Sequence, residues 1–160
     1  MPIAMTDELR AHYTTLVHRF FDDVFTREDR AAAEEILTPD FVFYGPPEGV
    51  HGIDAFFEVT HTIREALNIQ FQVEVVIVED EKTVSSLVTM RGKHENVVFR
   101  GAPPKGASFE VQRIDNFVIE NGKIKELNAV LDHQMLMDCL RNPEKGLQNR
   151  SQHNSPSLAR

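Results

Sequence analysis

The sequence has few of the residues that build covalent or metal-held frameworks. Its 160 residues include one cysteine, Cys139, and no tryptophan. A single cysteine excludes an intrachain disulfide framework and any thiolate metal cluster. The histidines show neither His-x-x-x-His nor His-x-His spacing. The glycine patterns of nucleotide-binding loops and the nucleophilic-serine elbow are absent as well. These patterns therefore predict no metal site and no nucleotide site.

Long apolar runs and an excess of positive charge are also missing. No segment approaches the ~18 apolar residues that a membrane span needs, and Met1 to Arg10 is too short and polar for a signal peptide. The net charge is −8, whereas phosphate backbones favour a basic surface. We therefore expect a cytoplasmic protein with neither a membrane nor a nucleic-acid partner.

The first half of the chain has the periodicity of helices. Apolar residues recur at helical spacing from Leu9 to Val24, and Thr6 is placed as the N-cap. A second start at Thr26 leads to a short helix, Ala31 to Leu37, which Pro39 ends. A third helix runs from Ile53 to Leu67. Between them, Asp40 to Tyr44 is a short β-run.

After Asn68 the apolar period becomes two, which is typical of strands. The sequence predicts strands over Phe71 to Ile77, Thr83 to His94, Phe109 to Ile119 and Ile124 to Leu131. Asn121-Gly122 predicts a type I′ hairpin between the last two strands, because both positions need positive φ.

An amphipathic segment, His133 to Leu140, follows the last strand, and polar, Pro-interrupted sequence follows that segment. We therefore predict one α+β domain over residues 1–141 and a disordered tail over 142–160. A curved, mostly antiparallel sheet wrapped round three N-terminal helices would form a cone with an interior cavity. Such a cavity would suit a small molecule, although the many Phe residues could equally fill it.

Strand alternation predicts which polar side chains face inward. His94 shares the more apolar face of its strand, and Arg113 and Asp115 lie between apolar residues on one face of theirs. Inward charges need a partner or water; a β-bulge that reverses the register would also explain them. Asn128 and Asp132 share a mixed face with Ile124, as on a pocket wall.

Each candidate has a structural alternative. Asp132 is either the N-cap of the C-terminal helix or a buried acid/base. His94 is either an inward acid or a strand-end histidine bonded to a loop. Arg113 and Asp115 form either a structural ion pair or a substrate clamp. Tyr44 either donates its hydroxyl at the cavity mouth or packs half-buried.

Several motifs, taken in order, resemble one known family. Together they resemble a SnoaL-like polyketide cyclase, or ester cyclase, of the nuclear transport factor-like α+β cone superfamily, over about Leu9 to Leu140. The segments that carry the resemblance are Arg19 to Phe25, Pro39 to Pro46, Gly52 to Phe57, Arg91 to His94, Gly101 to Gly106, Ile114 to Phe117, Gly122 to Ile124, and Asp132.

The resemblance implies an enzyme without a cofactor and with a deep apolar cavity. In the cyclases, an aspartate at the position resembling Asp132 removes an acidic C–H proton, and the enolate closes a ring by aldol attack. The chain departs from the pattern at Val118, where an Arg or His is expected, and at Asn128, where a Trp is expected. These departures leave open whether the reaction is cyclisation or another proton transfer.

Two functional hypotheses follow. The first is an acid/base isomerase or aldol-type cyclase for an apolar, oxygenated small molecule such as a polyketide-like metabolite. Asp132 is its base and His94 its acid, and the substrate-binding residues are Asn128, Arg113, Tyr44, Asp115 and Phe57. The second is a non-catalytic ligand-binding or dimerisation module. In both, we expect a homodimer through the exposed sheet face, with Val76, Val78 and Leu87 in the patch.

Overall fold

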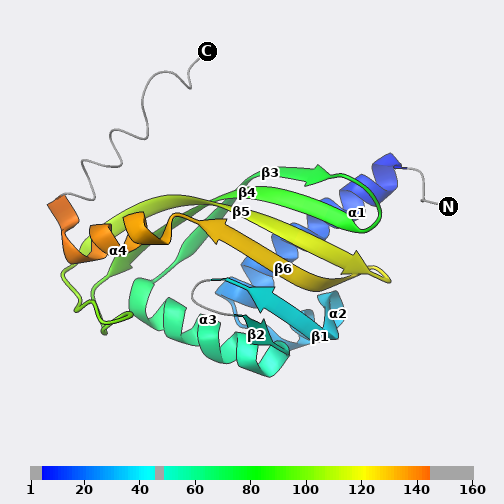
Figure 1. Cartoon of the computed structure of the whole chain (residues 1–160). Helices are drawn as coiled ribbons and strands as arrows, with labels where there is room; N and C mark the ends of the chain where they lie inside the picture. The colour runs from blue at the N-terminus through cyan, green and yellow to red at the C-terminus, as the bar shows by residue number, and fades with distance from the viewer. Residues whose placement is uncertain (1–4, 46–48, 145–160) are drawn as a thin grey trace, which may run out of the picture.

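A curved sheet and the helices packed inside it make up the computed structural model (Figure 1). The structure describes residues 5–45 and 49–144. The predicted tail, apart from residues 142–144, lies outside the described residues. In Figure 1 the sheet curves over α1, α2 and α3, and α4 lies near the end where β6 finishes. The predicted α+β cone fold is confirmed.

The helices begin at residues whose side chains accept backbone hydrogen bonds. Thr6 caps α1 (Asp7–Arg19) by accepting from the Leu9 amide at 3.1 Å, as predicted. The predicted second start at Thr26 is wrong. Asp29 caps α2 (Arg30–Ile36) instead, accepting from the Ala32 amide at 3.1 Å. The third helix, α3 (Ile53–Leu67), has the predicted bounds, and α4 spans His133–Arg141.

Between α1 and α2 the chain forms a π-helix, η1 (Phe20–Thr26), which the sequence periodicity does not distinguish from α-helix. The wider π turn places more side chains on one side. Phe20, Phe21, Val24 and Phe25 are all at most 2% exposed. This short segment therefore supplies much of the aromatic interior.

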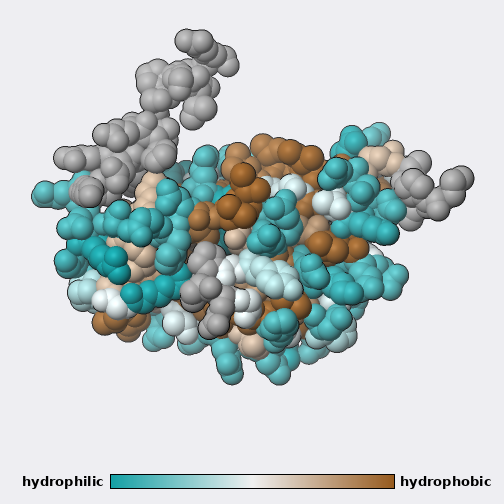
Figure 2. Space-filling model, viewed as in Figure 1, coloured by the Kyte–Doolittle hydropathy of each residue, from teal (hydrophilic) through white to brown (hydrophobic). Residues whose placement is uncertain are grey.

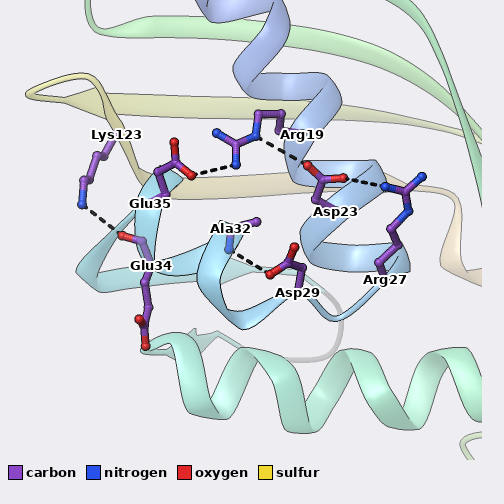
Figure 3. A network of polar contacts seen from close by, with 8 residues as sticks. All are labelled: Arg19, Asp23, Arg27, Asp29, Ala32, Glu34, Glu35 and Lys123. Carbon is purple, nitrogen blue, oxygen red and sulfur yellow. Dashed lines mark hydrogen bonds and ion pairs between the residues drawn. The ribbon is translucent and has the colours of Figure 1, made fainter.

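Arg19, the last residue of α1, makes polar contacts to both η1 and α2 on the surface (Figure 3). Arg19 Nη2 lies 3.0 Å from Glu35 Oε2, and Arg19 Nε lies 3.5 Å from Asp23 Oδ2. Lys123 Nζ donates to the Glu34 carbonyl at 3.0 Å, which ties α2 to the hairpin that follows the fifth strand. Exposed pairs of this kind contribute little each, and their role here is to fix the orientation of η1.

The sheet has six strands in the order β2-β1-β6-β5-β4-β3. All neighbours are antiparallel except β1 and β6. The strands are β1 (Leu37–Tyr44), β2 (Val50–His51), β3 (Gln70–Val78), β4 (Thr83–His94), β5 (Ala107–Glu120) and β6 (Lys123–Leu131). Asn121 and Gly122 turn between β5 and β6 with φ of 50° and 78°, which confirms the predicted hairpin.

The β4–β5 ladder is uninterrupted and sets the two faces of the sheet. Alternate residues of β5, including Arg113 and Asp115, are buried, and so is His94 at the end of β4. The predicted inward faces of both strands are confirmed, and no bulge reverses the register at Arg113.

Two β-bulges elsewhere reverse the alternation that the sequence predicts. In β3, Val73 pairs with Val88 but Val75 pairs with Leu87, so Glu74 is the extra residue. In β6, Ile124 pairs with Ile119 but Glu126 pairs with Val118, so Lys125 is the extra residue. Beyond each bulge, the side chains predicted to face inward face outward, because a one-residue shift exchanges the two faces.

The interior of the cone is filled by aromatic rings. Phe20 lies 5.1 to 6.4 Å, centroid to centroid, from each of five other Phe rings. A second group of buried apolar residues lies between α3, α4 and the ends of β4 and β5. No described helix is long and apolar enough to cross a membrane.

Candidate functional site

A partly open cavity lies between the inner face of the sheet and helices α3 and α4. Its volume is about 50 Å³, enough for a few water molecules and far below the ~300–1,000 Å³ of sites for drug-sized ligands. Most of the wall is apolar: Phe25, Phe43, Ile63, Leu67, Ile69, Met90, Phe99, Ala129, Leu131 and Leu136. The three described polar wall residues are Arg100, Arg113 and His133.

Arg113 forms the buried polar part of the wall, with its side chain 4% exposed. Its Nε lies 3.0 Å from Asp115 Oδ2, and its Nη2 donates to Asp115 Oδ1 at 2.6 Å. Three Phe rings surround the guanidinium, with centroids 5.5 to 5.9 Å from its central carbon. This aromatic shell adds cation–π attraction to the ion pair.

Asp115 lies behind Arg113 and is fully buried. Burial raises the pKa of Asp115, while the charge and hydrogen bonds of Arg113 act in the opposite direction. The structure therefore brings together two predicted site residues as a buried ion pair. Of the two, Arg113 reaches the cavity wall and Asp115 supports it.

Arg100 stands at the opposite, exposed end of the wall, in a tight turn. Phe99 and Ala102 exchange backbone hydrogen bonds of 3.0 and 2.9 Å across Arg100-Gly101. Both turn residues have positive φ, 47° for Arg100 and 80° for Gly101. Arginine is disfavoured in this conformation, where Asn or Gly is preferred. Such strain is found where surrounding contacts or function hold a residue in place.

His133 is the first residue of α4 and faces Arg100 across the mouth of the cavity. Arg100 Nη1 lies 3.0 Å from His133 Nδ1 and 3.3 Å from Nε2. Because a guanidinium only donates, a hydrogen bond here needs a neutral imidazole, with the ring nitrogen that lacks a proton as the acceptor. Burial lowers the pKa of His133, and the positive charges of Arg100 and Arg141 lower it further. His133 is thus a proton acceptor at an apolar cavity.

Asp132, the predicted base, is exposed and caps α4. Its Oδ1 accepts from the Met135 amide at 2.8 Å, which is the N-cap geometry. The prediction of a buried carboxylate at this position is therefore wrong. The structure supports the N-cap alternative, because the chain turns from strand to helix at Asp132 and the next residue faces the cavity.

His94, the predicted acid, is fully buried, but it lies outside the described cavity wall. Its Nε2 is 2.7 Å from the carbonyl oxygen of Val97, and because a carbonyl only accepts, Nε2 donates. Among the described residues, Nδ1 has no hydrogen-bond partner. The geometry is that of the alternative interpretation, a strand-end histidine bonded to the following loop.

Asn128 and Tyr44 do not lie on the cavity wall. They pair with each other across β6 and β1, and both are exposed, Tyr44 at 43%. The bulge at Lys125 turns Asn128 outward and Ala129 inward, so the predicted inward position of Asn128 is wrong. Tyr44 lies on the same outer side, next to Phe43, which does line the cavity.

Phe57 is half-buried on α3, beside the Phe core. Its ring lies 6.2 Å from that of Phe56 and 5.7 Å from the Arg30 guanidinium carbon. It is not among the described residues of the cavity wall. Phe57 therefore belongs to the packing of α3 against the core.

Sequence reasoning missed both polar residues at the mouth of the cavity. His133 was assigned only to the amphipathic helix, although the cap interpretation of Asp132 implies that the next side chain begins the helix face. Arg100 lies between the predicted strands that end at His94 and begin at Phe109, although Arg100-Gly101 occupies the same type of tight turn as Asn121-Gly122. Among the described residues, no group of three or more His, Cys, Asp or Glu side chains could hold a metal ion.

The cap and the acid/base interpretations of Asp132 predict different effects of substitution. An Asn at position 132 can still cap the helix, whereas Ala cannot. We expect Asp132→Ala to lower the free energy of unfolding by about 1 kcal/mol, and Asp132→Asn to leave it nearly unchanged, as measured by urea denaturation. Equal losses of stability in Asp132→Asn and Asp132→Ala would contradict the cap interpretation.

The sequence and the fold match known proteins. The family model for SnoaL-like polyketide cyclases matches residues 15–140. A candidate SnoaL-like polyketide cyclase from Jannaschia sp. CCS1 is 22% identical, with a TM-score of 0.77, over 88% of this chain and 99% of that one. TsrD from Streptomyces laurentii is 20% identical, with a TM-score of 0.70, over 84% and 97%. At these identities the solved structures establish the fold alone. No match was found among curated proteins.

Proposed function

The chain belongs to the SnoaL-like polyketide cyclase family, and we propose that it is an acid/base enzyme, an isomerase or an intramolecular aldol-type cyclase for an apolar, oxygenated small molecule. The observation that carries the proposal is His133 beside Arg100 at the mouth of a largely apolar cavity. General acid/base catalysis needs a group that can accept a proton near neutral pH. His133 meets this requirement, and its lowered pKa has an identified cause.

The contact between Arg100 and His133 suggests how proton transfer and charge stabilisation are coupled. A ring nitrogen of His133 takes a proton from the carbon next to the substrate carbonyl. The C–H electron pair moves into the carbonyl and leaves an enolate oxygen. The protonated nitrogen can no longer accept from Arg100, so an Arg100 N–H becomes available to the enolate oxygen as its charge forms. Return of the proton to another carbon gives isomerisation. Attack of the enolate carbon on a second carbonyl forms the ring bond, and the resulting alkoxide oxygen takes the proton back from His133.

The size of the cavity limits which part of a substrate it encloses. At about 50 Å³, it has room for a carbonyl group and its immediate neighbours. We place the reacting carbonyl of a larger substrate at the mouth that Arg100 and His133 form, with one part of the substrate inside the cavity and the rest outside. An apolar wall around the reacting atoms strengthens the electrostatic effect of both polar groups.

Removal of the imidazole tests the proposed base. His133→Gln should reduce ketone-dependent deuterium exchange by about 10²- to 10⁴-fold, with little change in melting temperature, because the side chain is only half-buried. The exchange rate of the wild-type protein should be constant near neutral pH and fall only as the pH drops through a midpoint below ~6.5, the ordinary pKa of histidine. NMR measurement of exchange in propanone checks both. A rate that rises on acidification would contradict a neutral imidazole base.

The positive φ of Arg100 predicts opposite effects on stability and activity. Arg100→Asn creates Asn-Gly, the preferred type I′ pair, so the melting temperature should be unchanged or higher. Exchange should fall by about tenfold or more because the donor to the enolate is lost. Arg100→Lys keeps both the positive charge and the strain of a positive φ at position 100, and it is therefore the control for both effects. Equal exchange rates in Arg100→Asn and the wild-type protein would show that the arginine has no part in the reaction.

We also infer that a second copy of the chain covers the outer face of the sheet. A row of apolar side chains crosses four paired strands there: Val75, Leu87, Ile114 and Val130. Three of them are 45 to 54% exposed, and Figure 2 shows an apolar area over β3 and β4. The expected patch residues Val76 and Val78 face the core instead, because of the bulge at Glu74. A continuous apolar row on an open sheet is typical of a two-fold symmetric interface.

A charge in the middle of this row should separate the dimer. Ile114→Asp is expected to give a monomer in size-exclusion chromatography with light scattering, at concentrations where the wild-type protein is a dimer. In a dimer of this variant, the two introduced carboxylates would face each other across the two-fold axis and repel. Thr62→Asp, on the exposed side of α3, is the control and should remain dimeric. A wild-type protein that is monomeric at all concentrations would contradict the inference.

A further inference from the structure

Arg113 has one edge that its ion pair leaves available. The hydrogen bonds to Asp115 use Nε and Nη2. Within the described part of the chain, Nη1 donates to no protein acceptor, and the side chain lines the cavity. A guanidinium carries five N–H donors in a fixed plane, so the orientation imposed by Asp115 also fixes where the remaining edge points.

The Arg113–Asp115 pair is buried and enclosed by aromatic rings. Arg113 is 4% exposed and Asp115 is fully buried, and three aromatic rings hold the guanidinium from its sides. A buried ion pair contributes little net stability compared with well-packed apolar residues. A buried donor edge that faces a cavity is, by contrast, what a ligand oxygen needs.

We propose that the Nη1 edge of Arg113 binds an uncharged carbonyl oxygen, and that the ligand therefore carries a second carbonyl group in addition to the one that reacts at the mouth. The proposal rests on the function proposed above, because His133 and Arg100 already define the first oxygen position. The ligand class is a dicarbonyl compound with an apolar connection: one oxygen contacts Arg113 inside the cavity, and the other contacts Arg100 at the mouth.

The negative charge behind Arg113 determines that the inner oxygen is uncharged. Asp115 already balances the guanidinium, and a ligand carboxylate would place a second anion on the same cation, inside an apolar wall. Like charges that share a buried site repel strongly. A ketone or ester oxygen accepts the hydrogen bond without adding a charge.

Three isosteric compounds, propanone, acetate and 2-methylpropene, separate these cases. They have equal numbers of non-hydrogen atoms and differ in carrying a neutral oxygen, a charge or neither. Binding to the full-length protein is followed by NMR through the shifts of cavity methyl groups. We expect the wild-type protein to bind propanone at least about tenfold more tightly than either of the others, the change typical of one hydrogen bond to a charged group.

The variant Arg113→Gln/Asp115→Asn replaces the ion pair by a neutral amide pair and removes the guanidinium edge. Propanone binding should weaken by about tenfold or more, while 2-methylpropene binding changes by less than about twofold. The matched control is Arg91→Gln/Glu110→Gln, which removes a 2.6 Å ion pair between β4 and β5 on the outer face of the sheet and should leave both affinities unchanged.

The outcomes separate this proposal from the proposed function. Propanone binding that depends on Arg113, without deuterium exchange, would overturn the function and support the carbonyl site. Equal binding of propanone and 2-methylpropene, tighter binding of acetate, or no saturable shift at any propanone concentration at which the protein stays folded would each overturn the carbonyl site. If the double variant does not fold, the preference of Arg100→Asn among the three compounds decides the matter, because that variant lacks the arginine at the mouth and keeps Arg113.

Discussion

The ion pair between Arg113 and Asp115 is the constraint around which the interior is arranged. Two opposite charges inside a shell of Phe rings are tolerable only while their geometry is maintained, because loss of one partner leaves a buried, uncompensated charge that costs about 3–5 kcal/mol. The uninterrupted β4–β5 ladder maintains that geometry. The π-helix η1 supplies two of the three rings that enclose the guanidinium. The strand register and the π-helix therefore both position the Arg113 side chain.

The same arrangement divides the interior into a filled part and a hollow part. The rings of Phe20 and its neighbours fill the interior between the sheet and the segment α1, η1 and α2. The cavity lies where α3 and α4 meet the ends of the strands. The polar groups are placed accordingly, with Arg113 at the boundary of the aromatic packing and Arg100 and His133 toward solvent. The family membership of the chain agrees with an interior site of this kind, although the solved relatives at about 20% identity establish only the fold.

Much of the fold could be predicted from local signals, because periodicity and turn residues record local geometry. The bounds of α3, the Asn121-Gly122 turn and the inward position of Arg113 all follow from such signals. The two β-bulges could not be predicted, since an extra residue such as Lys125 changes the pairing without changing the apolar pattern. The misplacement of Asn128 follows directly from that bulge. Asp132 was misjudged for another reason: a carboxylate before a helix is compatible with both a cap and a buried acid, and only the direction of the chain separates them.

The bulge at Lys125 has a consequence for how this cavity can change over evolution. Beyond it, Ala129 and Leu131 face the hollow, while Asn128 and Val130 face outward. Loss of the single extra residue would exchange the two sets and bring an amide and a different apolar side chain to the inner wall at once. A length change of one residue is thus a route to new ligand preferences that substitution at individual wall positions would reach only in several steps.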